Sequence, residues 1–472
     1  MKSFFRTPEK RKVKLFLLVD LACLGVSLLS AFLLQIAMGD GLTHSFEPIA
    51  RLPLFARVVA LVNLAFIFSA VVMVFGGVCL LVFYVAGLYE VECICSRKRI
   101  AVKLGTAVAV GTLLSYLLSQ LIFGRMFAPE IWAFHGVLLF LLLWFMRLRV
   151  YRRMVSREPF KVLVLGSSGP DNLSTKTVDY LSSNGSRPLF EFSYCPVEEF
   201  IERYGAPGAN GRYELIVYPF QEKLPKEVLN TLVKKKFEGT GICNSFEFYK
   251  NSTGSLPVFE LDAQWLVNLS VSLTLAQNVQ QRVKRILDIF VALFLLVMFS
   301  PLMVLISILI KADSKGPVLY RQKRVGLSNQ EFTTHKFRTM VADAESRSGP
   351  VWAQKGDTRT TGVGRVLRKT GMDELPQLFD ILRGKMSFVG PRPIRAVFEQ
   401  EFARSIPFYS LRTMVKPGLT GWGQVGAFDP RSPDGPQKRF EHDLFYIHEY
   451  SLFLDAVISL KTLKKLVWAK GE

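Results

Sequence analysis

Two adjacent carboxylates, Asp373 and Glu374, are the residues of this sequence best suited to chemistry. Basic residues lie on both sides of the pair, with Lys336 and Arg338 before it and Arg392 after it. Arginine offers a fixed fork and lysine a compact charge, and both suit phosphate groups. An ionised aspartate can attack phosphorus, and a second carboxylate beside it can hold a Mg²⁺ that bridges phosphate oxygens. This combination indicates chemistry on phosphorylated substrates.

The local structure around the two carboxylates has two interpretations. Thr370 and Asp373 match a capping box, which would simply start a helix. Pro376 would then lie inside that helix and break its bonding, so we expect the helix to begin nearer Glu374 with proline in its first turn. At such an end the backbone amides favour ionised carboxylates and attract phosphate.

The basic clusters could also contact anionic lipid headgroups. For the cluster of residues 321–324 the two interpretations are equally supported. Lys336, Arg338 and Arg392 should be held in place by turns or by flanking apolar residues. Their arrangement therefore favours substrate binding.

Composition places these residues in a membrane protein of several domains. The chain has 472 residues, 50% of them hydrophobic, and a formal net charge of +20. A chain of this length exceeds one ordinary core. Such a basic surface suits either nucleic acid, or anionic lipid together with phosphorylated substrates. The long apolar runs between the basic clusters favour lipid and phosphorylated substrates, so we expect no nucleic-acid partner. No cysteine lies after Cys243, which excludes thiol catalysis in the carboxyl-terminal part.

Four apolar segments are long enough for a bilayer crossing, which needs about 20 residues each. They span roughly residues 13–38, 58–87, 104–123 and 131–146, so residues 1–150 are predicted to form a four-helix transmembrane bundle. Lysine and arginine gather before the first segment, between the second and third, and after the fourth, where Arg147 and Arg149 lie. The charge bias puts the amino terminus and everything after residue 150 in the cytoplasm.

Residues 158–275 change to a soluble α/β pattern. Residues 161–166 indicate a buried strand that ends in a turn, and residues 215–218 indicate a second strand. We interpret this region as a degenerate Rossmann-like domain. Its turn has Gly166 and Gly169 followed by Pro170 instead of the dinucleotide fingerprint. This favours a structural or regulatory role over cofactor binding.

A fifth apolar run, residues 286–310, is interrupted by Ser300 and Pro301, and the re-entrant helix expected around it spans residues 284–311. Proline removes a backbone donor and clashes with the preceding turn, so a kink is expected. Both flanks of the run are basic, which argues against a crossing. We therefore expect a re-entrant hairpin of two half-helices that enters and leaves by the same face; the alternative is a plain kinked span.

Five motifs over residues 282–472 resemble the bacterial sugar transferase family, the monotopic polyprenyl-phosphate phosphoglycosyl transferases. The motifs are residues 321–326 (RQKRVG), 336–340 (KFRTM), 373–377 (DELPQ), 384–393 (GKMSFVGPRP) and 416–424 (KPGLTGWGQ). Four spans and a nucleotide-fold domain ahead of them resemble the long members that start exopolysaccharide or capsule repeat units. The resemblance implies a mostly α catalytic domain with a re-entrant membrane helix, at the cytoplasmic face of the bacterial inner membrane.

The resemblance also implies a mechanism and site residues. Asp373 would be the nucleophile of a dyad with Glu374, and both would share Mg²⁺. Lys336, Arg338 and Arg392 would bind substrate phosphates, and Asp443 would be a further acidic residue of the site. The enzyme would move a hexose 1-phosphate from a UDP-sugar, with UDP-glucose or UDP-galactose favoured, to undecaprenyl phosphate. A covalent aspartyl phospho-sugar would form and UMP would leave; the oligomeric state stays open.

Two other functions would account for parts of the sequence. A membrane-anchored nucleotide-sugar dehydratase or epimerase would need a dinucleotide fingerprint and usually a Tyr-x-x-x-Lys pair, but none of the 14 tyrosines has lysine four residues later. A non-enzymatic scaffold of polysaccharide assembly would explain the apolar and basic segments. It gives no reason for paired carboxylates among phosphate-binding motifs.

Overall fold

A computed structural model describes most of the chain. The described residues are 8–37, 74–86, 88, 97–123, 129–155, 159–166, 172–183, 190–204, 213–220, 223–261, 275–341, 359–426 and 434–468. The chain divides into two compact units, Met1–Phe248 and Tyr249–Glu472. The domain boundaries proposed from the sequence stay predictions.

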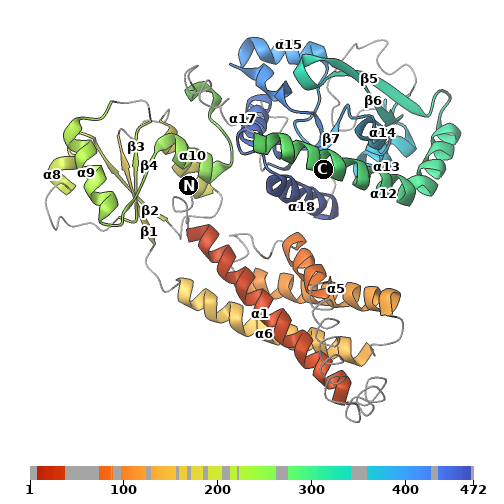
Figure 1. The fold of residues 1–472 in the computed structure, drawn as a ribbon, viewed down its shortest axis with the longest axis horizontal. Helices are drawn as coiled ribbons and strands as arrows, with labels where there is room; N and C mark the ends of the chain where they lie inside the picture. Colours follow the sequence, from red (N-terminus) through yellow and green to blue (C-terminus); the bar gives the residue numbers. More distant parts are fainter. Residues whose placement is uncertain are drawn as a thin grey trace. The chain divides into compact units, whose positions relative to one another are not determined.

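The amino-terminal part of the first unit is helical (Figure 1). Its helices are α1 (Pro8–Ala37), a described helical stretch at Val74–Val85, α5 (Arg97–Phe123) and α6 (Pro129–Val155). They pack through a shared apolar core that includes Leu24, Phe83, Leu104 and Leu139. All four predicted segments therefore contain helix, although residues 58–73 lie outside the described part. Membrane crossing by four segments stays a prediction.

A buried ion pair joins α1 to α6. Arg147 donates from Nε and Nη2 to the two carboxylate oxygens of Asp20, at 3.2 and 2.5 Å, and from Nη1 to the carbonyl of Leu88 at 3.1 Å. The two charged side chains are 1% and 0% exposed. Arg147 is therefore bound inside the helical core, although the sequence pattern had grouped it with the basic residues that flank a membrane segment.

The second half of this unit is a parallel α/β sheet. Its elements are β1 (Phe160–Leu165), α7 (Leu173–Ser183), β2 (Phe190–Cys195), α8 (Phe200–Tyr204), β3 (Leu215–Tyr218), α9 (Lys226–Phe237), β4 (Gly241–Asn244) and α10 (Ser245–Thr253). The strand order is β2-β1-β3-β4, all parallel. Alternate residues of β1 pack into two different cores, Val162 and Val164 on one face and Leu163 and Leu165 on the other. Helices on both faces explain why β1 is apolar from Val162 to Leu165.

In its described residues the second unit is mostly helical, with two small sheets. Its elements are η3 (Val258–Glu260), α12 (Leu275–Asp313), β5 (Leu319–Val325), η5 (Leu327–Asn329), β6 (Glu331–Phe337), α13 (Gly362–Thr370), η6 (Met372–Glu374), α14 (Gln377–Leu382), β7 (Ser387–Val389), α15 (Ala396–Ser405), η7 (Tyr409–Met414), β8 (Gly418–Thr420), α16 (Trp422–Val425), α17 (Gly435–His448) and α18 (Leu452–Trp468). Strands β5 and β6 pair antiparallel, and β7 and β8 pair parallel.

Helix α12 runs through Ser300 and Pro301 as one helix. The secondary structure therefore has no interruption at the position expected from the sequence, and the separation into two half-helices stays a prediction. Proline at 301 lacks the N–H that would bond the carbonyl of Val297, but the Ser300 hydroxyl donates to that carbonyl at 2.9 Å. The side chain thus replaces the missing backbone donor, and the helix continues.

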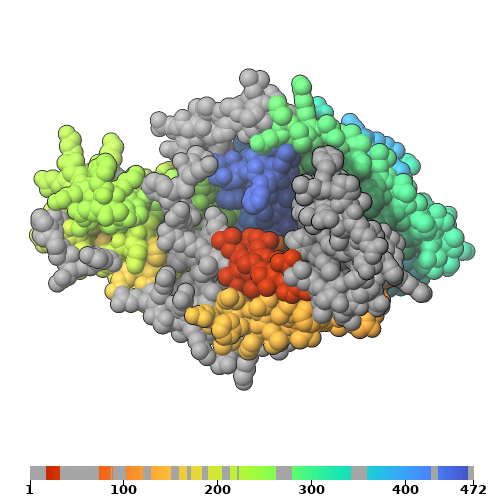
Figure 2. Space-filling view, turned by 60° about the horizontal axis from the view of Figure 1, so that its bottom comes forward, coloured from red at the N-terminus to blue at the C-terminus, as the bar shows by residue number. Residues whose placement is uncertain are grey.

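The two halves of α12 pack on different parts of the unit. Ala292 belongs to a core with α14, and Ile306 and Ile310 belong to a second core with β6 and α13. The outer side of the helix is apolar and exposed, with Phe290 at 72% and Val297 at 76%, and it lies at the surface in Figure 2. Two helices in the described part of the chain are long and apolar enough to cross a bilayer, Pro129–Arg149 and Val279–Asp313. The re-entrant path stays a prediction.

Candidate active site

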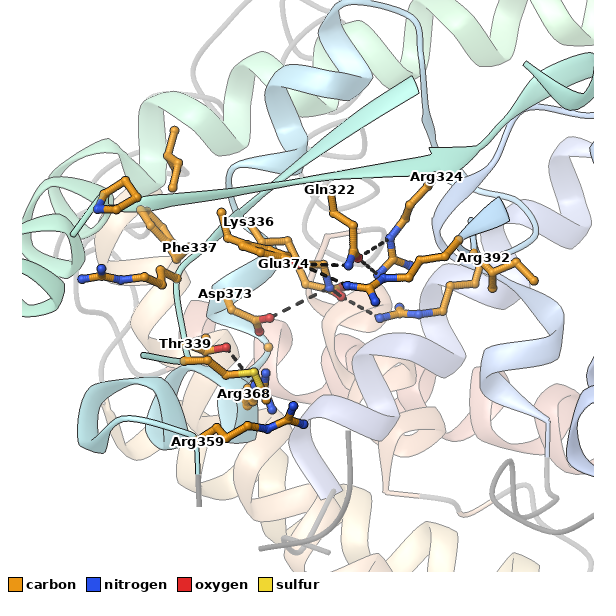
Figure 3. A pocket seen from close by; sticks show the side chains of 18 of the residues that line it. Gln322, Arg324, Lys336, Phe337, Thr339, Arg359, Arg368, Asp373, Glu374 and Arg392 are labelled. Atoms are coloured by element: carbon orange, nitrogen blue, oxygen red, sulfur yellow. Dashed lines mark hydrogen bonds and ion pairs between the residues drawn. The ribbon is translucent and has the colours of Figure 1, made fainter. Parts of the chain in front are cut away.

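A cavity of about 600 Å³ opens in the second unit beside the β5-β6 hairpin (Figure 3). Among its lining residues are two acids, Asp373 and Glu374. The basic side chains that line it are Arg324, Lys336, Arg338, Arg359, Arg368, Arg392, Arg395 and Arg439. Eight cations around two carboxylates leave a strong positive excess, which suits a ligand with several negative charges.

A glycine sets the position of the two carboxylates. Gly371 ends α13 with φ +71°, a left-handed conformation that glycine adopts without steric cost. The chain then forms the short helix η6, which holds Asp373 and Glu374, and α14 begins only at Gln377 after Pro376. The expected helix start near Glu374 is wrong by a few residues, because proline precedes α14. Thr370 does not form the capping box; its hydroxyl donates to carbonyls within α13.

Glu374 is held by two cations at one oxygen. Lys336 Nζ lies 2.5 Å from Glu374 Oε1, and Arg392 Nη2 lies 2.9 Å from the same atom. Burial opposes ionisation of Glu374, but Arg392 and Lys336 outweigh it and lower its pKa to about 2. Glu374 is therefore a fixed anion that orients the two basic side chains.

Asp373 is held less tightly. Its Oδ2 lies 4.0 Å from Lys336 Nζ, and the side chain is 14% exposed. Burial raises the pKa of Asp373, with the neighbouring Glu374 adding to the shift, while Lys336, Arg392 and Arg368 oppose it. Figure 3 shows Asp373 between the Lys336–Glu374–Arg392 group and Arg368. Asp373 is thus the carboxylate better placed to react.

Arg392 is positioned by a close backbone approach between two of the sequence motifs. Gly390 N donates to the carbonyl of Thr420 at 2.9 Å, and Gly418 N donates to the carbonyl of Pro391 at 3.0 Å. A Cβ at Gly418 would lie 2.1 Å from Gly390 N. Only glycine permits this approach, so the two glycine-rich motifs fix the loop that presents Arg392.

Arg338 lines the cavity but binds the protein's own backbone. It donates to the carbonyls of Ser314 and Lys315, at 2.7 and 2.6 Å, and to the Ser314 hydroxyl at 2.9 Å. These contacts hold the chain just after the carboxyl end of α12. A phosphate-binding role for Arg338 stays a prediction, and the geometry shows a structural contact.

Asp443 lies behind the cavity wall. It is 2% exposed and is absent from the described residues that line the cavity, whereas Arg439, one turn earlier in α17, is among them. Arg412 Nη2 lies 3.4 Å from Asp443 Oδ2. Burial raises the pKa of Asp443, against the opposing charges of Arg412 and Arg439. The structure brings Lys336, Asp373, Glu374 and Arg392 together and places Asp443 apart from them.

Several further residues line the cavity; of these, Arg324 belongs to the basic cluster of residues 321–324, for which the sequence left substrate and lipid equally supported. Arg324 bonds Gln322 Oε1 at 2.8 Å and the carbonyl of Pro393, and burial, with repulsion from Arg392, lowers its pKa to about 10. Arg368 Nε donates to Thr339 Oγ1 at 2.8 Å. The position of Arg324 could have been inferred from the alternation of side chains along its strand, because successive side chains point to opposite faces of a sheet. Arg359, Arg395 and Arg439 had no comparable signal.

Comparison with known proteins gives an independent assignment. The bacterial sugar transferase family matches residues 279–469. An Aeromonas hydrophila protein, "UDP-N-acetylgalactosamine-undecaprenyl-phosphate N-acetylgalactosaminephosphotransferase", is 44% identical over 189 residues, which cover 40% of this chain and 44% of that protein. A Klebsiella pneumoniae protein, "UDP-glucose:undecaprenyl-phosphate glucose-1-phosphate transferase", is 40% identical over 39% of each chain.

A protein of the same printed name from Caulobacter vibrioides is 41% identical over 186 residues, which cover 39% of this chain and 69% of that protein. The matched region spans less than half the length of the Aeromonas and Klebsiella relatives. The region that the family model matches, residues 279–469, contains every residue that lines the cavity, including both carboxylates. The chain therefore belongs to the bacterial sugar transferase family.

Proposed function

We propose that this protein transfers a hexose 1-phosphate from a UDP-sugar to undecaprenyl phosphate and releases UMP. The observation that carries the proposal is the pairing of Asp373 and Glu374 on the wall of a cavity with eight basic side chains. The names of the relatives point to the same donor and acceptor classes. The reaction would be the first membrane step of exopolysaccharide or capsule synthesis.

The arrangement supports two successive displacements. A carboxylate oxygen of Asp373 forms a bond to the sugar-proximal phosphorus, and the bond from that phosphorus to the bridging oxygen breaks, so UMP leaves. An oxygen of the polyprenyl phosphate then attacks the same phosphorus and frees Asp373. Both steps spread negative charge over phosphate oxygens, where fixed cations lower the barrier.

Lys336 and Arg392 supply fixed cations beside the reacting group. Both are anchored on Glu374, which orients them before substrate arrives. Their arrangement needs no reorganisation as charge develops, which is the condition for electrostatic catalysis. Glu374 thus acts through the cations that it holds, in addition to any share in metal binding.

The two carboxylates fit Mg²⁺. This ion prefers oxygen ligands and is usually held by one or two carboxylates together with substrate phosphates. Among the described residues no group of three His, Cys, Asp or Glu side chains could hold a metal ion. Mg²⁺ bound by Asp373 and Glu374 would neutralise charge on the phosphate oxygens.

The membrane helps to bring the two substrates together. The exposed apolar side of α12 suits lipid, and a re-entrant path of this helix would keep the cavity at the cytoplasmic interface. A cytosolic UDP-sugar and a lipid-borne phosphate could both reach Asp373 there. Single cysteines at residues 282 and 314 should then be labelled from the same side by an impermeant reagent; labelling from opposite sides would overturn the re-entrant path.

A panel of UDP-sugars tests the function directly. The purified chain is assayed for UMP release with undecaprenyl phosphate, and UDP-glucose or UDP-galactose is expected to be the best donor. UDP-N-acetylgalactosamine belongs in the panel because one relative carries that sugar in its name. Absence of UMP release from every donor would overturn the proposal and favour a non-enzymatic scaffold.

A further inference from the structure

A buried charge cluster lies directly behind Arg392. Arg412, from η7, is 4% exposed, and its Nη2 donates to the backbone carbonyl of Arg392 at 2.6 Å. Its Nη1 lies 3.3 Å from Glu399 Oε2 and 3.1 Å from Tyr409 Oη. Asp443 approaches from α17. Side chains from three separate elements, α15, η7 and α17, therefore meet at the Arg412 guanidinium, which bonds the backbone of the residue that holds Glu374.

The geometry points to Arg412 as a positioning residue for Arg392, with Glu399 and Asp443 fixing Arg412 in turn. The inference rests on the proposed function. Arg412 neither lines the cavity nor contacts the dyad among the described contacts. It acts through the chain: its guanidinium fixes the Arg392 backbone, and the Arg392 side chain bonds Glu374 at 2.9 Å.

Only arginine can make this set of contacts. The guanidinium bonds one backbone carbonyl and three side chains, and its centre lies 5.1 Å from the ring centroid of Tyr409. A lysine would keep the positive charge between Glu399 and Asp443, but its single nitrogen could not also hold the Arg392 carbonyl. The charge balance and the positioning contact can therefore be separated by one substitution.

The backbone before Arg412 is strained. Phe408 has φ +58°, a left-handed conformation that is rare for a bulky residue. It directly precedes η7, whose residues Tyr409 and Arg412 are both buried. Strain of this kind persists only where surrounding contacts hold it. The contacts of Arg412 with Arg392, Glu399 and Asp443 supply such a hold.

This arrangement also gives Asp443 a physical role. The resemblance to the transferase family suggested an acidic residue of the active site, but Asp443 is buried behind the wall. It contacts Arg412, which fixes Arg392, and it lies electrostatically close to Arg439, which lines the cavity. Asp443 therefore supports cavity arginines rather than touching substrate.

A double-mutant cycle tests the inference. Arg412→Lys, Arg392→Ala and the double variant are compared with the wild type for UMP release and for affinity for inorganic phosphate. Arg404→Lys, an exposed arginine of α15, is the matched control and should behave as wild type. Arg412→Lys alone is expected to lower kcat/KM about tenfold or more, or roughly 1.4 kcal/mol, without loss of folded protein.

The cycle separates positioning from general stability. If Arg412 acts through Arg392, Arg412→Lys has little further effect once Arg392 is alanine, because interacting residues are not additive. Additive losses, or wild-type kinetics for Arg412→Lys, would overturn the inference. A wild type that binds phosphate but releases no UMP from any donor defeats the proposed function instead, and the phosphate affinities then decide the role of Arg412.

Discussion

Two buried charge centres in this chain are built on opposite plans. In the amino-terminal helices, Asp20 and Arg147 satisfy each other at both carboxylate oxygens, and Leu88 accepts a further bond. In the second unit, Lys336 and Arg392 converge on one oxygen of Glu374, beside a cavity with many more cations. In the first centre each charge is matched by its partner, and we call it the closed centre. The second centre carries an excess of positive charge, and we call it the open centre.

The difference separates a stability element from a ligand site. A closed ion pair holds two helices together, and removal of one partner leaves an uncompensated buried charge. An open centre with surplus cations leaves positive charge for a ligand to neutralise. Mutations in the first centre should therefore change stability, and mutations in the second should change activity.

The largest effect is expected at the nucleophile. Asp373→Asn should abolish both turnover and any phospho-sugar adduct, because an amide is a poor nucleophile. UMP release and mass spectrometry of the intact protein check this, and the melting temperature should stay near that of the wild type. Near-wild-type UMP release by the variant would rule out the covalent mechanism.

The closed centre should respond in stability. Arg147→Leu leaves Asp20 buried without its partner, so a loss of about 3–5 kcal/mol in unfolding free energy is expected. Thermal unfolding in detergent measures it, and replacing Asp20 by leucine as well should restore much of the loss. Arg149→Leu, at an exposed site nearby, is the control. Equal effects of the Arg147 and Arg149 substitutions would contradict the comparison.

A milder change tests the open centre. Arg392→Lys keeps the charge but loses the fork, so kcat/KM should fall about tenfold or more, roughly 1.4 kcal/mol. Stability should change little, in contrast to Arg147→Leu. Unchanged kinetics would indicate that Arg392 has a structural role or contacts lipid headgroups instead of binding substrate.

Local patterns predicted some elements closely. The strand expected at residues 215–218 is β3 (Leu215–Tyr218), because a short apolar run buried on both faces has few alternatives. Strands β2 and β4 were not identified. The polar residues of β2, such as Glu191 and Ser193, obscure its pattern.

Long-range contacts decided the features that the sequence could not predict. The dyad was found from residue types, but its anchoring by Lys336 and Arg392 depends on segments distant in sequence. Asp443 was assigned to the site by motif, and only packing shows it behind the wall. Pro301 signalled a break, and the Ser300 hydroxyl that replaces its missing donor is a side-chain geometry that periodicity does not describe.

The smallest expected effect is a shift of the acid limb along the pH axis, separate from the loss of rate that removal of the Lys336 cation brings, and it distinguishes the two carboxylates of the open centre. Burial raises the pKa of Asp373, and Lys336 opposes that rise. Lys336→Met removes the opposing charge, so the pKa of Asp373 should rise further. Since Asp373 must be ionised to attack, activity should be lost at a higher pH as the solution is acidified.

The acid limb of kcat/KM against pH is the measurement, and Lys323→Met, 80% exposed on β5, is the control. Glu374, with a pKa of about 2 and its bond to Arg392, should stay ionised across the assayed range. An acid limb unmoved by Lys336→Met would mean that a group other than Asp373 limits activity in acid.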